Sequence, residues 1–269
     1  MSVITISRGS FSGGKMLAQC LSKELGYRCV DREVIVERAA AHGVSQDELR
    51  DAMQKPPTFM ERIQHKKYLY LVLIQAALIE EVRTGKAVYH GNAGHLLLKG
   101  GPHILRVRII APMELRVKMA QDRLKLGQDE ALDYIARMDQ DRRKWTQYLY
   151  GVDWSDSANY DIVLNLEYMD ISGACQAVST LARQRCFDFT PCCQAAMDDL
   201  ALASQVRREL ALHDSTSHVE VEVTAKGSAV RIAGSVSNMW EVEEVRLIAA
   251  AVPGVETLDL DELASPSRS

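Results

Sequence analysis

The stretch VITISRGSFSGGKMLAQCLSKEL, residues 3–25, decides the fold of this chain. Residues 3–7 form a short apolar run, which predicts a buried strand. From residue 16 onward, apolar side chains recur at helical spacing as far as Gly26, and a glycine commonly ends a helix in the left-handed conformation. A glycine-rich loop joins the two elements, and its members are Gly9, Ser10, Phe11, Ser12, Gly13, Gly14 and Lys15.

The glycine-rich loop satisfies the pattern G-x-x-x-x-G-K between a strand and a helix. In this context backbone N–H groups and the helix N-terminus can hold phosphate oxygens, and the lysine can reach the terminal phosphates. A plain glycine-rich turn that feeds a helix is the alternative interpretation. Met16 stands where a serine or threonine would ligate magnesium, so the nucleotide phosphates and water would have to hold that ion. A further interpretation makes Met16 a core residue of a loop that no longer binds ATP.

Strands and helices alternate through the rest of the first half. The expected strands are residues 27–30, 86–90, 104–110 and 161–166. The expected helices are residues 33–41, two helices that begin at the capping-box patterns Ser45-x-x-Glu48 and Thr58-x-x-Glu61, and residues 112–126, 129–148 and 171–185. This order predicts an α/β fold, with a mostly parallel sheet covered by helices on both faces.

The second half has a different order. Residues 187–193 interrupt the periodicity and contain Pro191, so we expect a first domain at residues 1–186 and a linker at residues 187–197. For the second domain, residues 198–263, the order of elements predicts a small αββαβ sandwich with its helices on one face. Residues 264–269 are expected to form a tail. Its expected elements are a helix at 198–212, strands at 218–224 and 228–233, a helix at 239–252 and a strand at 255–260.

Composition excludes several classes of protein. The chain has 269 residues, 47% hydrophobic and 25% charged, which is typical of globular proteins. Its net charge of -4 argues against nucleic acid as a partner. Residues 196–269 carry 6 Lys and Arg against 13 Asp and Glu, so the second half is acidic.

The longest apolar stretch, at residues 68–79, is shorter than the roughly 20 residues that span a bilayer. We expect no transmembrane segment, no secretory signal and a cytoplasmic location.

Five stretches of the first half resemble the cytidylate kinase-like family of P-loop nucleoside monophosphate kinases. They are ITISRGSFSGGKMLAQCLSKELGYRCVDREVI, AVYHGNAGHLLL, LRVRIIAPMELRVKM, DQDRRKW and YGVDWSDSANYDIVLNL. The resemblance implies a P-loop kinase-type fold with a five-stranded parallel sheet, a helical insertion that binds the acceptor nucleotide, and an arginine-bearing lid. It also implies that ATP, with Mg²⁺, donates its terminal phosphoryl group to a nucleoside monophosphate.

The resemblance assigns roles to individual residues. The glycine-rich loop and Met16 match the donor-phosphate loop. Asp31 matches an acidic position on the acceptor side, although it is equally suited to cap the helix that begins at Arg32. Arg142 and Arg143 match the lid, where guanidinium groups would stabilise charge on the transferring phosphoryl group, but such a run also suits a solvated helix face. Arg116 and Arg123, seven residues apart, are expected on one face of the preceding helix.

Two positions depart from the family pattern. Met16 lacks the magnesium-ligating hydroxyl, and Asn92, in Gly91-Asn92-Ala93-Gly94, stands where these kinases usually have an arginine that holds the acceptor phosphate. Cations of the expected acceptor-binding insertion, if they do not simply face water, can replace it: Arg62, His65, Lys66 and Lys67. The departures keep two other functions open: a catalytically degenerate protein that binds or senses nucleotides, and a structural adaptor.

The second domain resembles a BON domain. The resembling stretch is ALASQVRRELALHDSTSHVEVEVTAKGSAVRIAGSVSNMWEVEEVRLIAAAVPGVETLDL, with Gly227, Gly234 and Gly254 at its turns. The resemblance implies a module that binds phospholipid or protein and carries out no chemistry. Because an anionic membrane repels an acidic surface, we expect a protein partner or a regulatory role.

Overall fold

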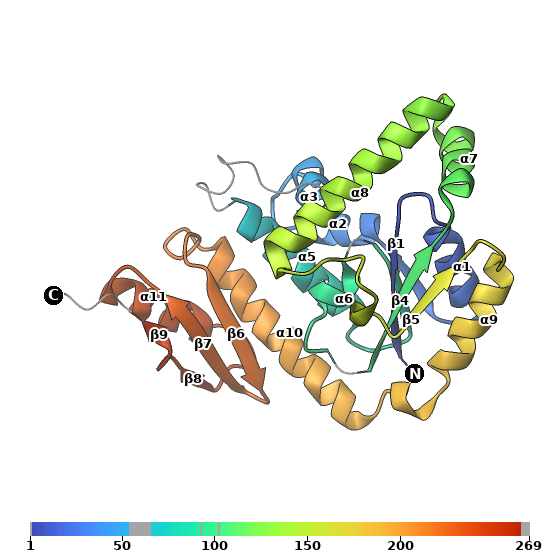
Figure 1. Cartoon of the computed structure of the whole chain (residues 1–269). Helices are drawn as coiled ribbons and strands as arrows, with labels where there is room; N and C mark the ends of the chain where they lie inside the picture. The colour runs from blue at the N-terminus through green and yellow to red at the C-terminus, as the bar shows by residue number, and fades with distance from the viewer. Residues whose placement is uncertain (1, 54–65, 92, 102, 265–269) are drawn as a thin grey trace.

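The computed structural model describes residues 2–53, 66–91, 93–101 and 103–264. Its central element is a five-stranded parallel sheet of order β2-β3-β1-β4-β5 (Figure 1). The strands are β1 (Val3–Arg8), β2 (Arg28–Asp31), β3 (Ala87–His90), β4 (Ile104–Ile110) and β5 (Ile162–Asn165). The α/β prediction is therefore confirmed. Since β1 pairs with both β3 and β4, the glycine-rich loop leaves the sheet at its centre.

Helices cover both faces of this sheet (Figure 1). Ile4 and Ile6 pack on the face that carries α1 (Gly14–Leu25) and α9 (Ile171–Ala182), whereas Val3 packs on the other. Side chains alternate across a strand, so a strand buried on both faces is apolar at most positions, as at residues 3–6, where only Thr5 is polar. The other face carries α2 (Arg32–Ala40), α3 (Gln46–Ala52) and α5 (Lys66–Val82).

A helical hairpin lies beyond the carboxyl end of β4. It consists of α7 (Met113–Leu124) and α8 (Gln128–Tyr150), with Phe11 of the glycine-rich loop packed against it. Further along α8, the indole N–H of the buried Trp145 donates to the carbonyl oxygen of Ala52 in α3 at 2.6 Å. The long helix is thus fixed at both ends. The shorter elements are α6 (Gly94–Leu97), η1 (Ser157–Asn159) and η2 (Arg185–Phe187).

The C-terminal unit, α10 and the elements after it, contains a four-stranded sheet of its own. Its sheet has the order β6-β7-β8, with β9 paired to β7. Val206 of α10, Val245 of α11 and Ile232 of β7 share one core, so both helices cover the same face of the sheet. The elements are α10 (Pro191–Leu212), β6 (Val221–Lys226), β7 (Ala229–Ser235), α11 (Met239–Ala250), β8 (Thr257–Asp259) and β9 (Leu263–Ala264).

Residues 191–197 of the predicted linker are helical, because α10 begins at Pro191. The side chain of Thr190 caps this helix by accepting a hydrogen bond from the backbone N–H of Cys193. A proline at the first helical position lacks only an N–H that the first turn leaves unbonded, so Pro191 starts a helix here. The fully buried Met197 joins the core on the α5 face of the main sheet.

Other boundaries also differ from the prediction. The β6 strand begins at Val221 instead of residue 218, and Ala264, predicted to lie in the tail, is the last residue of β9. The predicted capping box at Thr58 and Glu61 lies outside the described residues. The division of the chain into separate domains remains a prediction.

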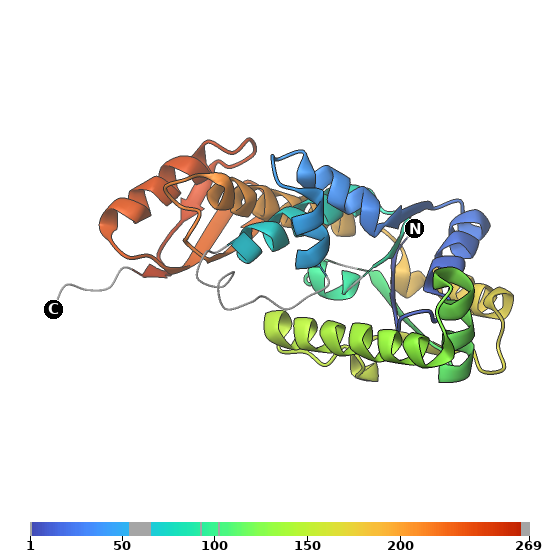
Figure 2. The same cartoon turned by 90° about the horizontal axis from the view of Figure 1, so that it is seen from above.

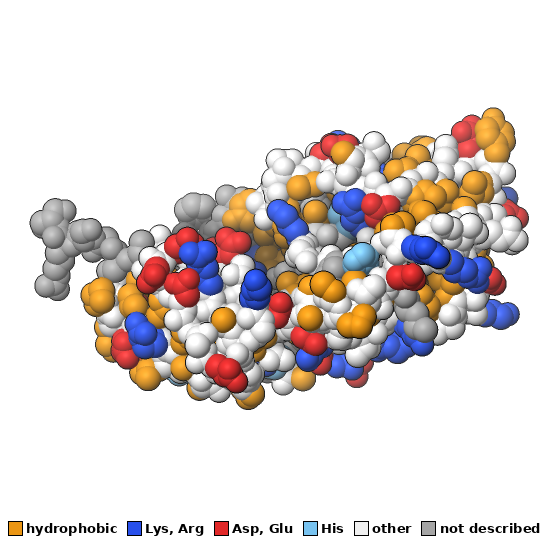
Figure 3. Space-filling view, turned by 90° about the horizontal axis from the view of Figure 1, so that it is seen from below, with side chains coloured by type: hydrophobic (Ala, Val, Ile, Leu, Met, Phe, Trp, Pro, Cys, Tyr) orange, Lys and Arg blue, Asp and Glu red, His pale blue; other side chains and the backbone are white. Residues whose placement is uncertain are grey.

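The C-terminal unit forms one end of the molecule (Figure 2). On the face drawn in Figure 3, acidic side chains gather over this unit, and lysine and arginine side chains gather over the opposite end. On this face, the charge asymmetry of the sequence is thus also seen in space. None of the helices in the described part of the chain combines the length and the apolar character needed to cross a bilayer.

Candidate active site

A cavity of about 660 Å³ lies at the carboxyl ends of β1, β2 and β3. Ser10, Phe11, Ser12, Gly13, Gly14, Lys15 and Met16 all line it. Gly9 lies behind the lining: a Cβ at Gly9 would come within 2.8 Å of the Ser12 hydroxyl and 3.3 Å of the Arg116 guanidinium. The structure therefore brings together the predicted loop residues except Gly9, whose lack of a side chain lets Arg116 approach.

The N-terminus of α1 is open toward this cavity. Gly13 adopts the left-handed conformation with φ of 81°, and no side chain caps the helix. The backbone N–H groups of Gly14, Lys15 and Met16 make no hydrogen bond to a described residue. Unbonded N–H groups at a helix N-terminus attract anions, and Lys15 adds a positive charge beside them. This end of the cavity fits the phosphates of a nucleoside triphosphate.

Met16 lines the same cavity and is 50% exposed. The interpretation of Met16 as a core residue is therefore wrong. Its thioether offers no oxygen to magnesium, so the loop would have to leave that ion to phosphate oxygens and water. Among the described residues there is no group of three or more His, Cys, Asp and Glu side chains placed to hold a metal.

The first part of the glycine-rich loop is bound to the α7–α8 hairpin. The carboxylate of Asp139 accepts hydrogen bonds from the backbone N–H and the hydroxyl of Ser10, each at 3.0 Å. Arg116 donates to the carbonyl oxygen of Ser10 at 2.8 Å and also pairs with Asp139. Arg142 donates to the carbonyl oxygen of Arg8 at 2.7 Å. We call Asp139, Arg116 and Arg142 the hairpin clamp.

Of the two arginines predicted for the lid, the structure brings only Arg142 to the cavity. Its guanidinium is buried, and burial, reinforced by the charge of Arg8, lowers its pKa to about 10. The side chain of Arg143 is 63% exposed and lies 4.0 Å from Asp153. Consecutive helical residues point about 100° apart, so adjacent arginines on α8 cannot both face the cavity.

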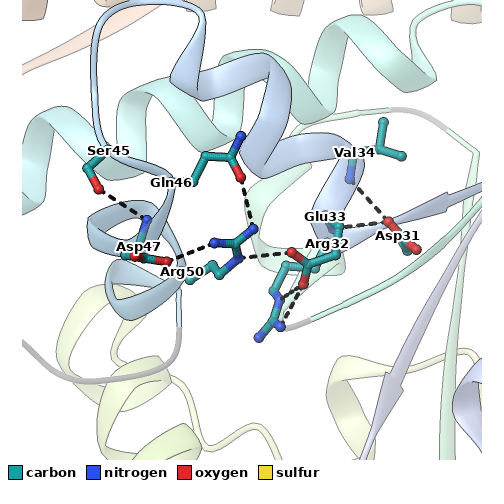
Figure 4. A network of polar contacts seen from close by, with 8 residues as sticks. All are labelled: Asp31, Arg32, Glu33, Val34, Ser45, Gln46, Asp47 and Arg50. Carbon is teal, nitrogen blue, oxygen red and sulfur yellow. Dashed lines mark hydrogen bonds and ion pairs between the residues drawn. The ribbon is translucent and has the colours of Figure 1, made fainter.

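Arg116 and Arg123 lie on the same side of α7, as their spacing predicts. Arg116 belongs to the hairpin clamp, and Arg123 lines the cavity. The helix-cap interpretation of Asp31 is confirmed, and its role on the acceptor side stays a prediction. Its carboxylate caps α2 by accepting hydrogen bonds from the N–H groups of Glu33 and Val34, at 3.0 and 3.1 Å, and it also lines the cavity (Figure 4).

Beside Asp31, Arg32 also lines the cavity and is paired with Glu33 (Figure 4). Arg50 pairs with the same carboxylate from α3. Hydrogen bonding to Arg32 is the main cause that lowers the pKa of Glu33. The cavity wall at the start of α2 is therefore held by paired charges on the surface.

The lining residues that were not predicted include Arg8 and His90. Arg8 ends β1 and His90 ends β3, and each follows a run of buried residues. In parallel sheets the carboxyl ends of the strands commonly carry the ligand site. The signal that could have identified Arg8 and His90 is a charged or titratable residue at the end of a buried strand.

Not every predicted residue is among the described residues that line this cavity. Arg62, His65 and Asn92 lie outside the described residues. Lys67 lies at a second cavity of about 1090 Å³ between α5, α10 and β6. That cavity is larger, but it contains none of the predicted loop residues, Asp31 or Arg142. We therefore take the cavity at the glycine-rich loop as the candidate active site.

Comparison with known proteins places these residues in a family. A family model described as the cytidylate kinase-like family matches residues 3–168. A cytidylate kinase from Ignicoccus hospitalis is 29% identical over 173 residues, which cover 63% of this chain and 92% of that protein. A cytidylate kinase from Methanosarcina acetivorans is 30% identical over 166 residues, covering 61% and 87%.

Among solved structures, an uncharacterised protein from Eubacterium ventriosum superimposes with a TM-score of 0.53 at 18% sequence identity. The match covers 69% of this chain and all of that one. This likeness concerns the fold alone. The C-terminal unit lies beyond the residues that the family model matches.

Proposed function

The chain belongs to the cytidylate kinase-like family, and from this premise we propose that residues 1–186 transfer the terminal phosphoryl group of ATP to a nucleoside monophosphate. The observation that carries the proposal is the composition of one cavity. One side of this cavity is formed by Lys15 and the open N-terminus of α1, and the other side by Asp31 and His90 at the ends of β2 and β3. A donor and an acceptor phosphate can thus be held in the same space.

The donor side of the site is the glycine-rich loop. The N–H groups of Gly14, Lys15 and Met16 would hold phosphate oxygens, and the Lys15 ammonium would neutralise the terminal phosphates. When bound, Mg²⁺ neutralises further charge on these oxygens. The side chains present here fit ATP, but they supply no oxygen at Met16.

The charge that develops on the transferring phosphoryl group needs a cation on the far side of the cavity. We assign this role to Arg142, which is buried and oriented by Asp139. Arg143 would reach the phosphates only after a rotation of α8, because its side chain points toward Asp153. Asp31, held by its two backbone hydrogen bonds, would orient the acceptor. Arg62 and Asn92 remain predictions for the acceptor side.

An assay of purified protein against CMP, UMP, AMP and GMP, with ATP and Mg²⁺, tests this function. We expect transfer to at least one acceptor, and a loss of at least a hundredfold in K15A because the donor phosphates lose their cation. R183Q is the matched control, since Arg183 is 58% exposed and pairs with Glu24 away from the cavity. If the wild-type protein transfers phosphate to none of the four, the proposal is wrong.

A second candidate function is nucleotide binding without turnover, with the signal passed through the C-terminal unit. The exposed Met16 at the cavity favours it, because the loop lacks the usual magnesium ligand. This function predicts ATP binding that K15A abolishes, no phosphoryl transfer, and a change in partner affinity when ATP binds. We further propose that the C-terminal unit, as a BON-like module, binds a protein that presents a basic surface, because residues 196–269 are acidic.

A further inference from the structure

We propose that Arg8, assisted by His90, binds the anionic group of the acceptor and so supplies the cation that Asn92 fails to supply. This inference rests on the proposed function and names a residue pair that the sequence pattern does not assign. It follows from four observations: how the Arg8 side chain is packed, what faces its guanidinium, the unbonded ring nitrogen of His90, and which side of the cavity both residues lie on.

The path of the Arg8 side chain is fixed by the glycine-rich loop. A Cβ placed on Gly14 would overlap the Cδ of Arg8, and it would lie 2.9 Å from the Nε and 3.0 Å from the Cγ. The stem of Arg8 therefore runs directly over the backbone at the start of α1. A side chain at Gly14 would therefore displace the stem of Arg8. The carbonyl oxygen of Arg8 is held in addition by the hairpin clamp through Arg142.

The guanidinium of Arg8 has no anionic partner among the described residues. No hydrogen bond or ion pair joins it to them. The nearby titratable groups are the cations Arg32, Arg123 and Arg142 and the phenol of Tyr89, which burial keeps protonated by raising its pKa. Burial is the main cause that lowers the pKa of Arg8. In contrast, Arg32 is paired with Glu33, and Arg142 with Asp139. An arginine that is largely shielded from water is costly without a counter-ion, so this position is prepared for an anion.

His90 gives a second, independent indication of a ligand. It is 5% exposed, lines the same cavity, and its Nδ1 has no hydrogen-bond partner among the described residues. Burial, and after it the charge of Arg8, lowers its pKa to about 4, so the ring is neutral at pH 7. A neutral imidazole still offers one donor and one acceptor. A buried ring nitrogen without a partner is expected to bond to a ligand when the cavity is filled.

The positions of Arg8 and His90 indicate that they bind the acceptor nucleotide rather than the donor nucleotide. Besides the hairpin cations Arg123 and Arg142, the groups near Arg8 are Tyr89 of β3 and Arg32 of α2. His90 pairs in register with Asp31. The donor phosphates would lie at the N-terminus of α1. Because β1 and β3 are neighbours, a side chain at the end of β1 can reach the space that a residue just after β3 would otherwise serve. The planar guanidinium suits a phosphate monoester, which it can bind through two parallel hydrogen bonds.

The test is titration calorimetry of the full chain with CMP, UMP, AMP, GMP and, separately, ATP. Two variants are compared with wild type: R8M, which keeps the stem but removes the charge, and R8K, which keeps the charge but not the planar fork. We expect R8M to weaken binding of the best monophosphate by at least about tenfold, with ATP affinity changed by less than about twofold. R8K should lie between, and R183Q should match wild type.

Thermal unfolding without ligand is the control that shows whether the variants fold. Since R8M removes an unpaired, shielded charge, its melting temperature should be no lower than that of wild type. In addition, the best monophosphate should raise the melting temperature of wild type more than that of R8M. A ligand-free melting temperature several degrees below wild type would assign Arg8 a structural role and overturn the inference.

The other outcomes separate this inference from the proposed function. If wild type transfers phosphate and R8M does so with an unchanged KM for the monophosphate, the function stands and the inference is wrong. If wild type binds a monophosphate through Arg8 but transfers nothing, the inference stands and the function is wrong. Loss of ATP affinity in R8M, or no monophosphate binding by wild type, overturns the inference.

Discussion

The carboxylate of Asp139 accepts two hydrogen bonds from Ser10, one from its backbone N–H and one from its hydroxyl. Ser10 belongs to the glycine-rich loop and Asp139 to α8, so this contact joins the two walls of the candidate active site. The same carboxylate pairs with Arg116 and Arg142, whose side chains are 11% and 9% exposed. One negative charge therefore orients the loop and both cations of the hairpin clamp.

The first prediction concerns that charge. D139N should lower the free energy of unfolding by about 2 kcal/mol or more, because it leaves two largely buried guanidinium groups without their counter-ion. It should also lower phosphoryl transfer, since Arg142 loses its orientation. Urea unfolding measures the stability. D133N is the control, because Asp133 is an exposed acid of the same helix. Equal stability of the two variants would contradict the clamp.

The second prediction concerns the contact between Gly14 and Arg8. G14A should destabilise the protein by about 1–3 kcal/mol, since the added Cβ overlaps the Arg8 side chain. In an R8A background the same substitution should be neutral or stabilising, because alanine favours the helix over glycine by roughly 1 kcal/mol. A double-mutant cycle on the free energy of unfolding measures the coupling. The same cost in both backgrounds would show that the two residues do not compete for space.

The sequence is sufficient to predict the main sheet and the glycine-rich loop, because their signals are local. The apolar run at residues 3–7, the loop pattern and the helical spacing after it depend only on neighbouring residues. Asp31 is a similar case, since a helix cap is encoded within three residues of the helix start. These features appear in the structure close to where they are expected.

Features that depend on distant residues were not predictable in this way. Asp139 precedes Arg142 by three residues and Arg143 by four, and both spacings allow an ion pair on a helix, so the local sequence does not tell which arginine engages Asp139 and the glycine-rich loop. The role of Arg8 depends on which strands lie beside β1, and the start of α10 depends on the core that Met197 enters. Pro191 has the same sequence context for a linker and for a helix start.

The third prediction concerns magnesium. M16T should lower the Mg²⁺ concentration needed for half-maximal ATP binding by several-fold, because it adds the hydroxyl that the loop lacks. Since Met16 is 50% exposed, the free energy of unfolding should change by less than about 0.5 kcal/mol. ATP titrations across a magnesium series measure the effect. M113T, at another exposed methionine, should leave the magnesium dependence unchanged, and a matching shift in that control would point to a non-specific cause.

The fourth prediction concerns the shared helix α10. Met197 is fully buried in the core beneath the main sheet, although α10 also supplies Val206 to the core of the C-terminal unit. M197A should therefore lower the free energy of unfolding by about 2–4 kcal/mol through the cavity that it leaves. M239A, at a methionine that is 70% exposed, should have little effect. If the two substitutions prove equally mild in denaturant titrations, α10 does not stabilise the first core.

The last prediction concerns acid. His95 of α6 is 8% exposed and packs against the ring of Tyr160, with centroids 4.7 Å apart. Burial, and then the charges of Arg106 and Arg108, lower its pKa to about 4. The unfolded chain therefore binds a proton near pH 6.5 that the folded chain does not bind until about pH 4. The contribution of His95 to the free energy of unfolding is fully present above pH 6.5, and it falls by about 3 kcal/mol as the pH drops toward 4.

H95F keeps an aromatic ring and removes the titration, so its free energy of unfolding should fall less steeply over this range. Urea unfolding at several pH values between 4 and 7 measures the slope, and part of it should remain because His90 titrates in the same direction. An unchanged slope in H95F would show that His95 is not held neutral by the fold.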